Sequence, residues 1–360
     1  MKAMLLAAGV GERMLPLTRV VPKPLIPVLG RPLAPQILGR LAAEGIEEVV
    51  VNVHHLSDEL RHGLGDGRLF GLNALHFSVE SERLLGTGGG LLAAAPMLRG
   101  SGTILVRNAD FLADVPLAQV LASHLRSGCL ATLVLVPHRP GYTPVTLDDN
   151  RRVVAFGNKK DKTVGAPRYL FTGYHLLEEE ALGMIPEGRP SDIVREVYFR
   201  LAEERKLGAY VHDGFWWEFG EPHEYLQGSI RLIEMDPEVR AGLGNFDPVR
   251  MVDAANVAVG PGADLHAEHI ALRGTLAIGL GVMVGERAAL EDSVVMPESW
   301  IGPGSSLTRC IVGPGTEIPA GFEAVNTVIV AAPDGNGPAL EGPEQIGSLL
   351  VRRFEGAPAR

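Results

Sequence analysis

Residues 5–18 read Leu5-Leu6-Ala7-Ala8-Gly9-Val10-Gly11-Glu12-Arg13-Met14-Leu15-Pro16-Leu17-Thr18, and residues 22–24 read Pro22-Lys23-Pro24. An apolar run, typical of a buried strand, ends in a turn with two glycines, followed by an arginine and by a lysine between prolines. Gly9 and Gly11 have no Cβ, so the backbone there can approach an oxyanion closely. Arg13 adds a forked set of donors, and Lys23 adds a point charge on a flexible stem. The stretch therefore predicts a strand that leads into a phosphate-binding turn, although its spacing is not that of a P-loop.

Composition limits the classes of protein to consider. With 360 residues, the chain is long enough for two domains. Its formal charge of -10 argues against a nucleic-acid partner, which needs a basic face. Cys129 and Cys310 lie far apart and form no ligand pattern, so we expect buried thiols in a cytoplasmic protein. No basic leader and no apolar run of membrane-spanning length is visible, so we expect no membrane partner.

The first two thirds of the chain alternate strands and helices. Apolar runs typical of buried strands occupy residues 2–7, 48–53, 75–79, 103–106 and 130–136. Residues 32–44 have the apolar spacing of a helix, at Leu33, Ile37, Leu38 and Leu41. This alternation predicts an α/β fold with a Rossmann-like, mostly parallel sheet. Ligands of such sheets lie at the carboxyl ends of strands. The opening turn and Asn108-Ala109-Asp110 should therefore face one crevice.

The spacing of apolar residues changes after residue 250. Aliphatic residues recur six apart at Ile278, Val284, Leu290 and Met296, and glycine often follows an aliphatic residue. A step of six predicts one face of a triangular coil per repeat, with the aliphatic side chain inside. The alternative is a glycine-rich loop region, which would be unusually long for a compact protein. We expect a catalytic domain at 1–235, a linker at 236–250, a hexapeptide coil at 251–330 and a Gly/Pro-rich tail at 331–360, with a helix near 345–354.

The opening string resembles the signature of the sugar-1-phosphate nucleotidyltransferases, also called nucleotide-sugar pyrophosphorylases. Glu12 stands where threonine is commoner in that family, and Met14 where leucine is commoner. Residues 51–56 and 85–91 are similar to those of mannose-1-phosphate guanylyltransferases and N-acetylmuramate-1-phosphate uridylyltransferases. The resemblance implies a nucleotide-diphospho-sugar transferase fold, and the hexapeptide segment is similar to the left-handed parallel β-helix that many members append.

The resemblance also implies an activity. Members join a nucleoside triphosphate to a sugar 1-phosphate and release pyrophosphate, with Mg²⁺ as cofactor. Because the sugar phosphate oxygen attacks the α-phosphorus directly, catalysis is positioning and charge neutralisation. We expect GDP-mannose formation from GTP and mannose 1-phosphate. The alternatives are UDP-sugar formation from UTP with glucose-, N-acetylglucosamine- or N-acetylmuramate-1-phosphate, or a non-catalytic regulatory subunit that binds sugar nucleotides.

The resemblance gives roles to the charged residues. Arg13 and Mg²⁺ would hold the triphosphate, and Lys23 would contact the reacting phosphates. Asp110 would bind Mg²⁺, with Ala109 where glycine is usual. Without the resemblance, a lone aspartate after a strand would be assigned to a turn or a helix cap. Glu218 occupies the place of a second metal-binding aspartate, and its alternative role is in a structural turn with packed tryptophans.

The remaining expected site residues bind nucleotide or sugar. The nucleotide- and substrate-binding set is Leu6, Ala7, Ala8, Gly9, Gly11, Gly86, Thr87, Gly88, Asn108, Thr172 and Gly173. The glycine-rich loop 86–90 would contact the nucleobase, or would serve as the entry to a helix at 91–98. Residues 171–173 would line the sugar side, whereas the family's Glu-Lys-Pro motif is not clear in residues 157–160. We expect His54 and His55 to be mostly structural, since no third ligand lies at a supporting spacing.

Two other functions can be compared with the residues of this chain. A sensor would keep the fold without turnover, a reading that Ala109 and Glu218 favour and that intact Arg13 and Lys23 oppose. A coil that transfers acyl groups is disfavoured because the coil is short and His266 and His269 are its only histidines nearby. We expect the coil to pack against the catalytic domain or to mediate homo-oligomers.

Overall fold

A computed structural model describes residues 1–157, 167–332 and 343–355. The chain divides into two compact units, and each is assembled from separate stretches of sequence. The first unit is Met1–Gly9 with Ile37–Trp216, and the second is Val10–Gln36 with Trp217–Arg360. The opening string is therefore shared, with its strand in the first unit and its charged residues in the second.

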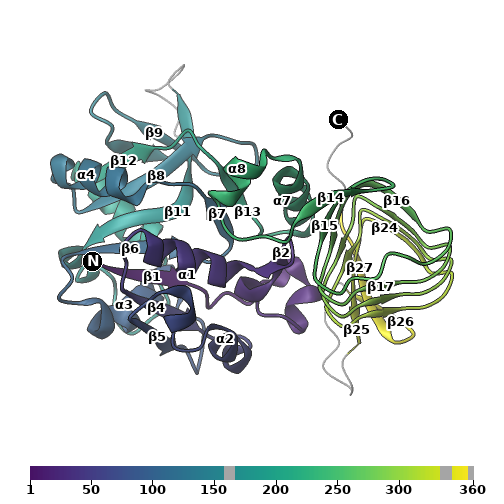
Figure 1. The fold of residues 1–360 in the computed structure, drawn as a ribbon. Coiled ribbons are helices and arrows are strands. Elements are labelled where there is room, and N and C mark those ends of the chain that lie inside the picture. Colours follow the sequence, from purple (N-terminus) through teal and green to yellow (C-terminus); the bar gives the residue numbers. More distant parts are fainter. Residues whose placement is uncertain (158–166, 333–342, 356–360) are drawn as a thin grey trace. The chain divides into compact units, whose positions relative to one another are not determined.

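The first unit is built on a nine-stranded mixed sheet (Figure 1). Its parallel core is β4 (Glu48–Val53), β1 (Lys2–Leu6) and β6 (Thr103–Asn108), with β5 (Ala74–Val79) beside β4. These four strands confirm the predicted parallel part of the sheet. The other five strands are β8 (Ala131–Pro137), β9 (Pro144–Leu147), β10 (Val153–Phe156), β11 (Arg168–Glu178) and β12 (Leu207–Val211). β11 runs antiparallel to both β6 and β8, which the spacing of the sequence did not indicate.

Helices and apolar strands enclose the core of this unit. The helices are α1 (Leu33–Ala43, which begins in the second unit), α2 (Ser57–Leu64), α3 (Gly86–Leu98), α4 (Leu117–Ser127), α5 (Glu179–Leu182) and α6 (Phe199–Glu203), with one π-helical turn (Val194–Tyr198) before α6. Met4, Val50 and Ile104 are fully buried, because strands covered on both faces have apolar side chains on both. No helix in the described ranges is long and apolar enough to cross a membrane.

The second unit opens with short turns. Three 3-10 turns, η1 (Glu12–Met14), η2 (Leu17–Arg19) and η3 (Lys23–Leu25), are followed by a small hairpin of β2 (Pro27–Val28) and β3 (Arg31–Pro32). The chain returns to this unit at β13 (Trp216–Glu218), α7 (Pro222–Glu234) and α8 (Pro237–Ala241). The frequent prolines of the opening string suit such turns, since proline cannot donate to a helix or sheet ladder.

The predicted coil is a parallel β-helix whose short strands stack in Figure 1. Its parallel strands are β15 (Ala254–Val259), β16 (Ala271–Ile278), β17 (Met283–Val284), β18 (Ala289–Glu291), β19 (Val294–Val295), β20 (Trp300–Ile301), β21 (Ser306–Thr308), β22 (Ile311–Val312), β23 (Glu317–Ile318), β24 (Glu323–Val325) and β25 (Thr327–Ala331). Before them, β14 (Val249–Val252) pairs antiparallel with β15. Met283 pairs with Trp300 and Trp300 with Glu317, a step of 17 residues. Two faces of six and one of five explain why the hexapeptide register slips. Ile278, Val284 and Leu290 point into the core as predicted.

The predicted helix near 345–354 is wrong. The chain forms β26 (Glu344–Ile346) and β27 (Leu349–Arg353), and β27 pairs antiparallel with β25. Leu349 and Val351 face the coil core on this strand. The open edge of β25 supplies backbone partners that a separate helix would not use, so strand pairing determines the structure here. Residues 333–342 of the predicted tail lie outside the described ranges.

The opening string packs directly on the end of the coil. Leu17 is fully buried, and a Cβ placed on Gly313 would lie 3.3 Å from its Cδ1 atom. Nη1 of Arg352, on the last strand, donates to the backbone oxygen of Glu12 at 3.3 Å. The hydroxyl of Tyr225 on α7 donates to the carbonyl of Pro27. Segments more than 300 residues apart in sequence therefore form one packed body.

Candidate active site

The two segments expected to share a crevice meet at one edge of the sheet. β1 and β6 are parallel neighbours, with Leu6 opposite Asn108. The N–H of Ala109 donates to the carbonyl of Leu6 at 3.1 Å. The turn that contains Asp110 is thus fixed against the start of the glycine turn, at the carboxyl ends of both strands.

A buried hydrogen-bond network supports the backbone that leads into the glycine turn. The N–H of Ala7 donates to Oδ1 of Asn52 at 2.8 Å, and Nδ2 of Asn52 donates to Oε1 of Glu80 at 2.8 Å. The other oxygen of Glu80 accepts from the N–H of Leu85 at 2.8 Å. Sequence reasoning missed Asn52 and Glu80. Their signal was a polar residue at or just beyond the end of an apolar strand. Ala7 and Ala8 are buried beside this network, whereas no atom lies within 4 Å of the Cβ position of Gly9.

The glycine-rich segment 86–90 is the first part of α3, which therefore begins five residues before the helix expected at 91–98. The N–H of Gly88 donates to the carbonyl of Ser191 at 2.9 Å, and a Cβ on Gly88 would lie 2.8 Å from the Ser191 hydroxyl. A Cβ on Gly90 would lie 2.8 Å from Nδ2 of Asn52. The hydroxyl of Thr87 accepts from the N–H of Ile193 at 3.0 Å. The glycines, including Gly86, permit close packing between α3 and its neighbours.

Thr172 and Gly173 interrupt the pairing of β11 with β8. The ladder shifts register between Phe171 and His175. Gly173 has a φ of 79°, and a Cβ there would lie 2.5 Å from Nδ2 of Asn108. The buried Thr172 hydroxyl donates to the carbonyl of Val134 at 2.8 Å. At this bulge, Gly173 therefore lies against Asn108, next to the turn that contains Asp110.

A cavity of about 450 Å³ opens beside the bulge. Its wall includes Phe171 from β11, Gly157 after β10, and Asp192 and Arg195 at the π-helical turn. Phe171, from the segment expected to line the sugar side, thus shares one hollow with Gly157, the first residue of the segment 157–160 in which the Glu-Lys-Pro motif is not clear. Residues 158–160 of the second segment lie outside the described ranges. Aromatic rings with a few charged groups can hold a small polar ligand.

Arg107 braces the turn that contains Asp110, a role that the sequence did not reveal. It is 2% exposed, its Nη2 donates to the carbonyl of Phe111 at 2.8 Å, and its Nε donates to the carbonyl of Asn108 at 3.4 Å. Its guanidinium carbon also lies 4.3 Å from the centre of the Phe111 ring. Burial lowers the pKa of Arg107 to about 10, so it is charged at neutral pH.

We expect Arg107→Met to lower the free energy of unfolding by about 3 kcal/mol, because buried carbonyls lose their charged donor. Urea denaturation followed by tryptophan fluorescence measures this. Arg99→Met, at an exposed arginine, is the matched control and should change stability by less than about 0.5 kcal/mol. Equal losses in the two variants would remove Arg107 as a brace of this turn.

In the second unit, Gly11 and Lys23 come together. Gly11 has a φ of 73°, its carbonyl accepts from the Thr18 hydroxyl at 2.9 Å, and its Cβ position is 3.4 Å from Cβ of Lys23. Lys23 is half-buried in η3, between Pro22 and Pro24, and proline fixes the backbone on either side. The second part of the signature is thus a compact turn with a held lysine.

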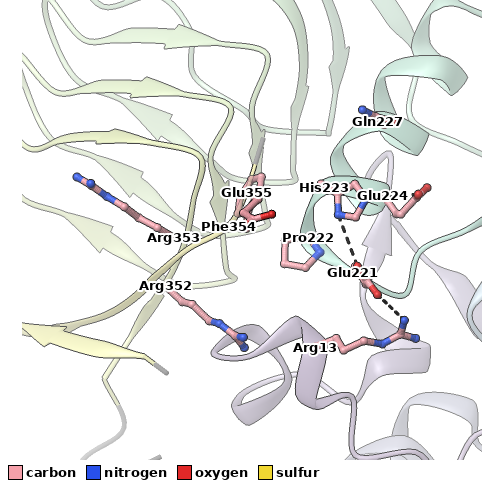
Figure 2. A pocket seen from close by; sticks show the side chains of 10 residues that line it. All are labelled: Arg13, Glu221, Pro222, His223, Glu224, Gln227, Arg352, Arg353, Phe354 and Glu355. Atoms are coloured by element: carbon pink, nitrogen blue, oxygen red, sulfur yellow. Dashed lines mark hydrogen bonds and ion pairs between the residues drawn. The ribbon is translucent and has the colours of Figure 1, made fainter. Parts of the chain in front are cut away.

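Arg13 is engaged by two carboxylates of the same unit. Its Nη1 lies 2.5 Å from Oε1 of Glu221, and its Nη2 lies 3.4 Å from Oε1 of Glu218. Arg13 and Glu221 line a cavity of about 670 Å³ that Arg352 also lines, and Figure 2 shows the Arg352 side chain pointing toward the Arg13 segment. Glu221 was missed because the family pattern has threonine at that position. The Arg13 side chain remains 58% exposed, so it is accessible to a larger anion.

The donor chemistry fits Mg²⁺. Within the described residues, no group of three or more His, Cys, Asp and Glu side chains could hold a metal. Mg²⁺ does not require one, since it binds one or two carboxylates together with water and substrate phosphates. Asp110 is half-buried at the edge of the sheet, and Glu218 ends β13; each can supply hard oxygen ligands.

Comparison with known proteins places these features in a family. The family model described as nucleotidyl transferase matches residues 2–234. Mannose-1-phosphate guanylyltransferase of Mycobacterium tuberculosis is 33% identical over 326 residues, which cover 89% of this chain and 81% of the relative. UTP–glucose-1-phosphate uridylyltransferase of Synechocystis is 28% identical, with 87% of both chains covered. Mannose-1-phosphate guanylyltransferase 1 of Arabidopsis thaliana is 30% identical, with 88% and 82% covered.

A solved structure shares the fold. The crystal structure of a Bacillus anthracis protein, assigned as a glucose-1-phosphate thymidylyltransferase, superposes with a TM-score of 0.54. It is 22% identical, and the match covers 64% of this chain and 93% of that one. At this identity the likeness concerns the fold alone.

Proposed function

The chain belongs to the nucleotidyl transferase family, and on this basis we propose that it forms GDP-mannose and pyrophosphate from GTP and mannose 1-phosphate. The observation that carries the proposal is the meeting of the two signature segments, with Leu6 opposite Asn108 and bonded to the N–H of Ala109. The guanylyltransferase names of several relatives favour guanosine and mannose.

The chemistry needs no protein nucleophile. A phosphate oxygen of the sugar 1-phosphate attacks the α-phosphorus of the triphosphate, and the bond to the bridging oxygen of the β-phosphate breaks as pyrophosphate leaves. Backbone N–H groups near Gly9 and Gly11 approach the phosphates without steric hindrance. Arg13 exchanges its carboxylate partners for phosphate oxygens, and Lys23 neutralises the charge that grows on the reacting phosphates.

Asp110 and Glu218 would hold Mg²⁺ with the triphosphate. When bound, the ion neutralises phosphate charge and helps to orient the leaving group. The role of Arg107 is to hold the backbone on both sides of Asp110, so that the carboxylate is positioned before substrate arrives. The network of Asn52 and Glu80 does the same for the glycine turn.

The cavity beside the β11 bulge would take the sugar. Phe171 offers an apolar face, and Asp192 and Arg195 offer hydrogen-bonding groups for hydroxyls. Thr172 and Gly173 would contact the substrate at the Asn108 side, and Gly86, Thr87 and Gly88 would lie toward the nucleobase. We further propose a cytoplasmic protein that associates through the coil, which size-exclusion chromatography with light scattering tests.

Pyrophosphate release tests the function. The panel pairs GTP, UTP, ATP, CTP and dTTP with mannose-, glucose- and N-acetylmuramate-1-phosphate in the presence of Mg²⁺. We expect the highest kcat/KM for GTP with mannose 1-phosphate. Absence of turnover across the panel, with nucleotide binding retained, would favour the non-catalytic sensor instead.

One relative supports a second candidate function. The Synechocystis uridylyltransferase matches 87% of this chain, so UDP-glucose formation from UTP is the alternative. The same panel separates the two, because a UTP enzyme should prefer UTP with glucose 1-phosphate over every GTP combination.

A further inference from the structure

A second polar cavity lies in the first unit, among residues that the proposed reaction does not use. Its volume is about 510 Å³, and its wall comes from the end of α4, the turn before β10 and the start of β12. Arg126, Arg151 and Arg152 all line it, together with hydroxyl and amide side chains. Among the described residues, no carboxylate lines it. Three cations without an acid in one hollow are unusual in a chain of net charge -10.

Two of these arginines are available to a ligand. Arg126 and Arg151 are exposed, and neither makes an ion pair within residues 1–157, 167–332 and 343–355. Arginine presents a planar fork of donors that matches the oxygens of phosphate. Two guanidinium groups without ion-pair partners in the described residues, on the wall of one cavity, therefore favour binding of an anion with several oxygens.

The third arginine fixes the wall. Nη2 of Arg152 donates to the carbonyl of Ser127 at 3.4 Å, and Nη1 lies 3.3 Å from Sγ of Cys129. Ser127 is the last residue of α4, where a helix carries partial negative charge. Arg152 compensates that charge, so the helix end does not repel an anion in the hollow.

Asp148 and Glu178, two acids near the wall of the cavity, are engaged elsewhere, whereas Asp149 is exposed and does not line the cavity. Oδ1 of Asp148 accepts from the N–H groups of Asn150 and Arg152, each at 2.9 Å. Oε1 of Glu178 accepts from Thr103 at 2.7 Å and lies 2.8 Å from Nε2 of His124. Neither carboxylate lines the hollow, so the cations are not neutralised from within it.

A glycine keeps the hollow open. A Cβ on Gly208 would lie 3.1 Å from Oγ1 of Thr132, which is itself 1% exposed, and 3.5 Å from the Ser127 hydroxyl. Its φ is not in the left-handed region, so the backbone does not require glycine there. The lack of space for a side chain therefore explains the glycine at position 208.

Sheet topology separates this hollow from the candidate active site. β8 runs parallel to β6, because both are antiparallel to β11, and β12 runs parallel to β8. Thr132 and Gly208 are each the second residue of their strands. The hollow therefore lies at the amino ends of strands, whereas Leu6 and Asn108 lie at the carboxyl ends.

We propose that this cavity is a second ligand site, which binds a small phosphate-bearing molecule through Arg126 and Arg151. The volume is in the range of small-ligand sites, roughly 300–1,000 Å³, and excludes a folded partner. The site would take free phosphate or a phosphomonoester, which share the same group. Binding there does not depend on turnover at the other edge.

Isothermal titration calorimetry with two probes, inorganic phosphate and glycerol 3-phosphate, tests the proposal at constant ionic strength. Lys23→Ala protein is the background, because it weakens phosphate binding at the candidate active site. We expect one bound probe per chain, and roughly tenfold or weaker binding when Arg126→Gln and Arg151→Gln are added. Tighter binding of inorganic phosphate would identify free phosphate as the ligand, and tighter binding of glycerol 3-phosphate would identify an organic phosphate.

Two further variants make the test specific. Arg250→Gln with Arg287→Gln removes the same charge from exposed positions on the coil and should leave affinity unchanged. Gly208→Ala narrows the hollow at constant charge and should weaken probe binding. Because its Cβ would lie 3.1 Å from Oγ1 of Thr132, the melting temperature is measured alongside. Unaltered affinity in the Arg126/Arg151 variant, or no probe binding in the Lys23→Ala background, would overturn the proposal.

Discussion

Asp110→Asn should lower kcat by roughly 10³-fold while the protein stays folded. The amide keeps the size and hydrogen-bonding capacity of the side chain but removes the negative charge that attracts Mg²⁺. Metal-ion stabilisation of transition-state charge is worth several kcal/mol, and each 1.4 kcal/mol is about tenfold in rate. Turnover measured over a Mg²⁺ titration, with circular dichroism for folding, gives the comparison.

The matched control is Asp149→Asn, which removes the same charge from an exposed turn of the same unit. Its turnover should stay within about twofold of the unmodified protein, as surface substitutions are usually mild. Binding of Mn²⁺ in the presence of nucleotide, followed by electron paramagnetic resonance, should weaken only in Asp110→Asn. Near-normal turnover in that variant would eliminate Asp110 as a metal ligand.

Lys23→Ala should lower kcat by roughly two orders of magnitude or more, the usual scale for losing one preorganised transition-state donor. Lys23 is held between prolines beside Gly11, which fixes the backbone from which its charge extends. The loss should appear chiefly in kcat, with a smaller rise in KM for the nucleotide, because the phosphate charge grows during the reaction.

Lys206→Ala is its control. Nζ of Lys206 lies 3.3 Å from Glu204 on the surface, where such an ion pair adds little to stability. Pre-steady-state product formation separates chemistry from product release in both variants. If Lys23→Ala changes KM but leaves kcat within about twofold, the lysine binds substrate without acting on the transition state.

The sequence predicted elements whose pattern is local. β4 agrees with the expected range because Val49, Val50 and Val51 form a short apolar run that is followed by a turn. α1 agrees within a residue because its apolar stripe is continuous. The coil was found from its period, and its slips reflect a 17-residue turn. The meeting of Leu6 with Asn108 followed from strand order alone.

What the sequence could not predict depends on partners distant in the chain. Arg107 lies just beyond the predicted strand 103–106, and only its contacts with the carbonyls of Asn108 and Phe111 reveal its role. The glycines of 86–90 looked like a loop until Ser191 was found against them. Residues 349–353 became a strand because β25 offered an open edge. Each is a case in which tertiary contact determines local conformation.

The packing of Leu17 against Gly313, and of Arg352 on the backbone of Glu12, has a consequence for biosynthesis. The charged segment leaves the ribosome 340 residues before Arg352, which donates to its backbone. At about 5–20 residues per second, that delay is tens of seconds. The segment therefore lacks this contact until β27 has been translated, and a truncation that removes Arg352 removes the contact permanently.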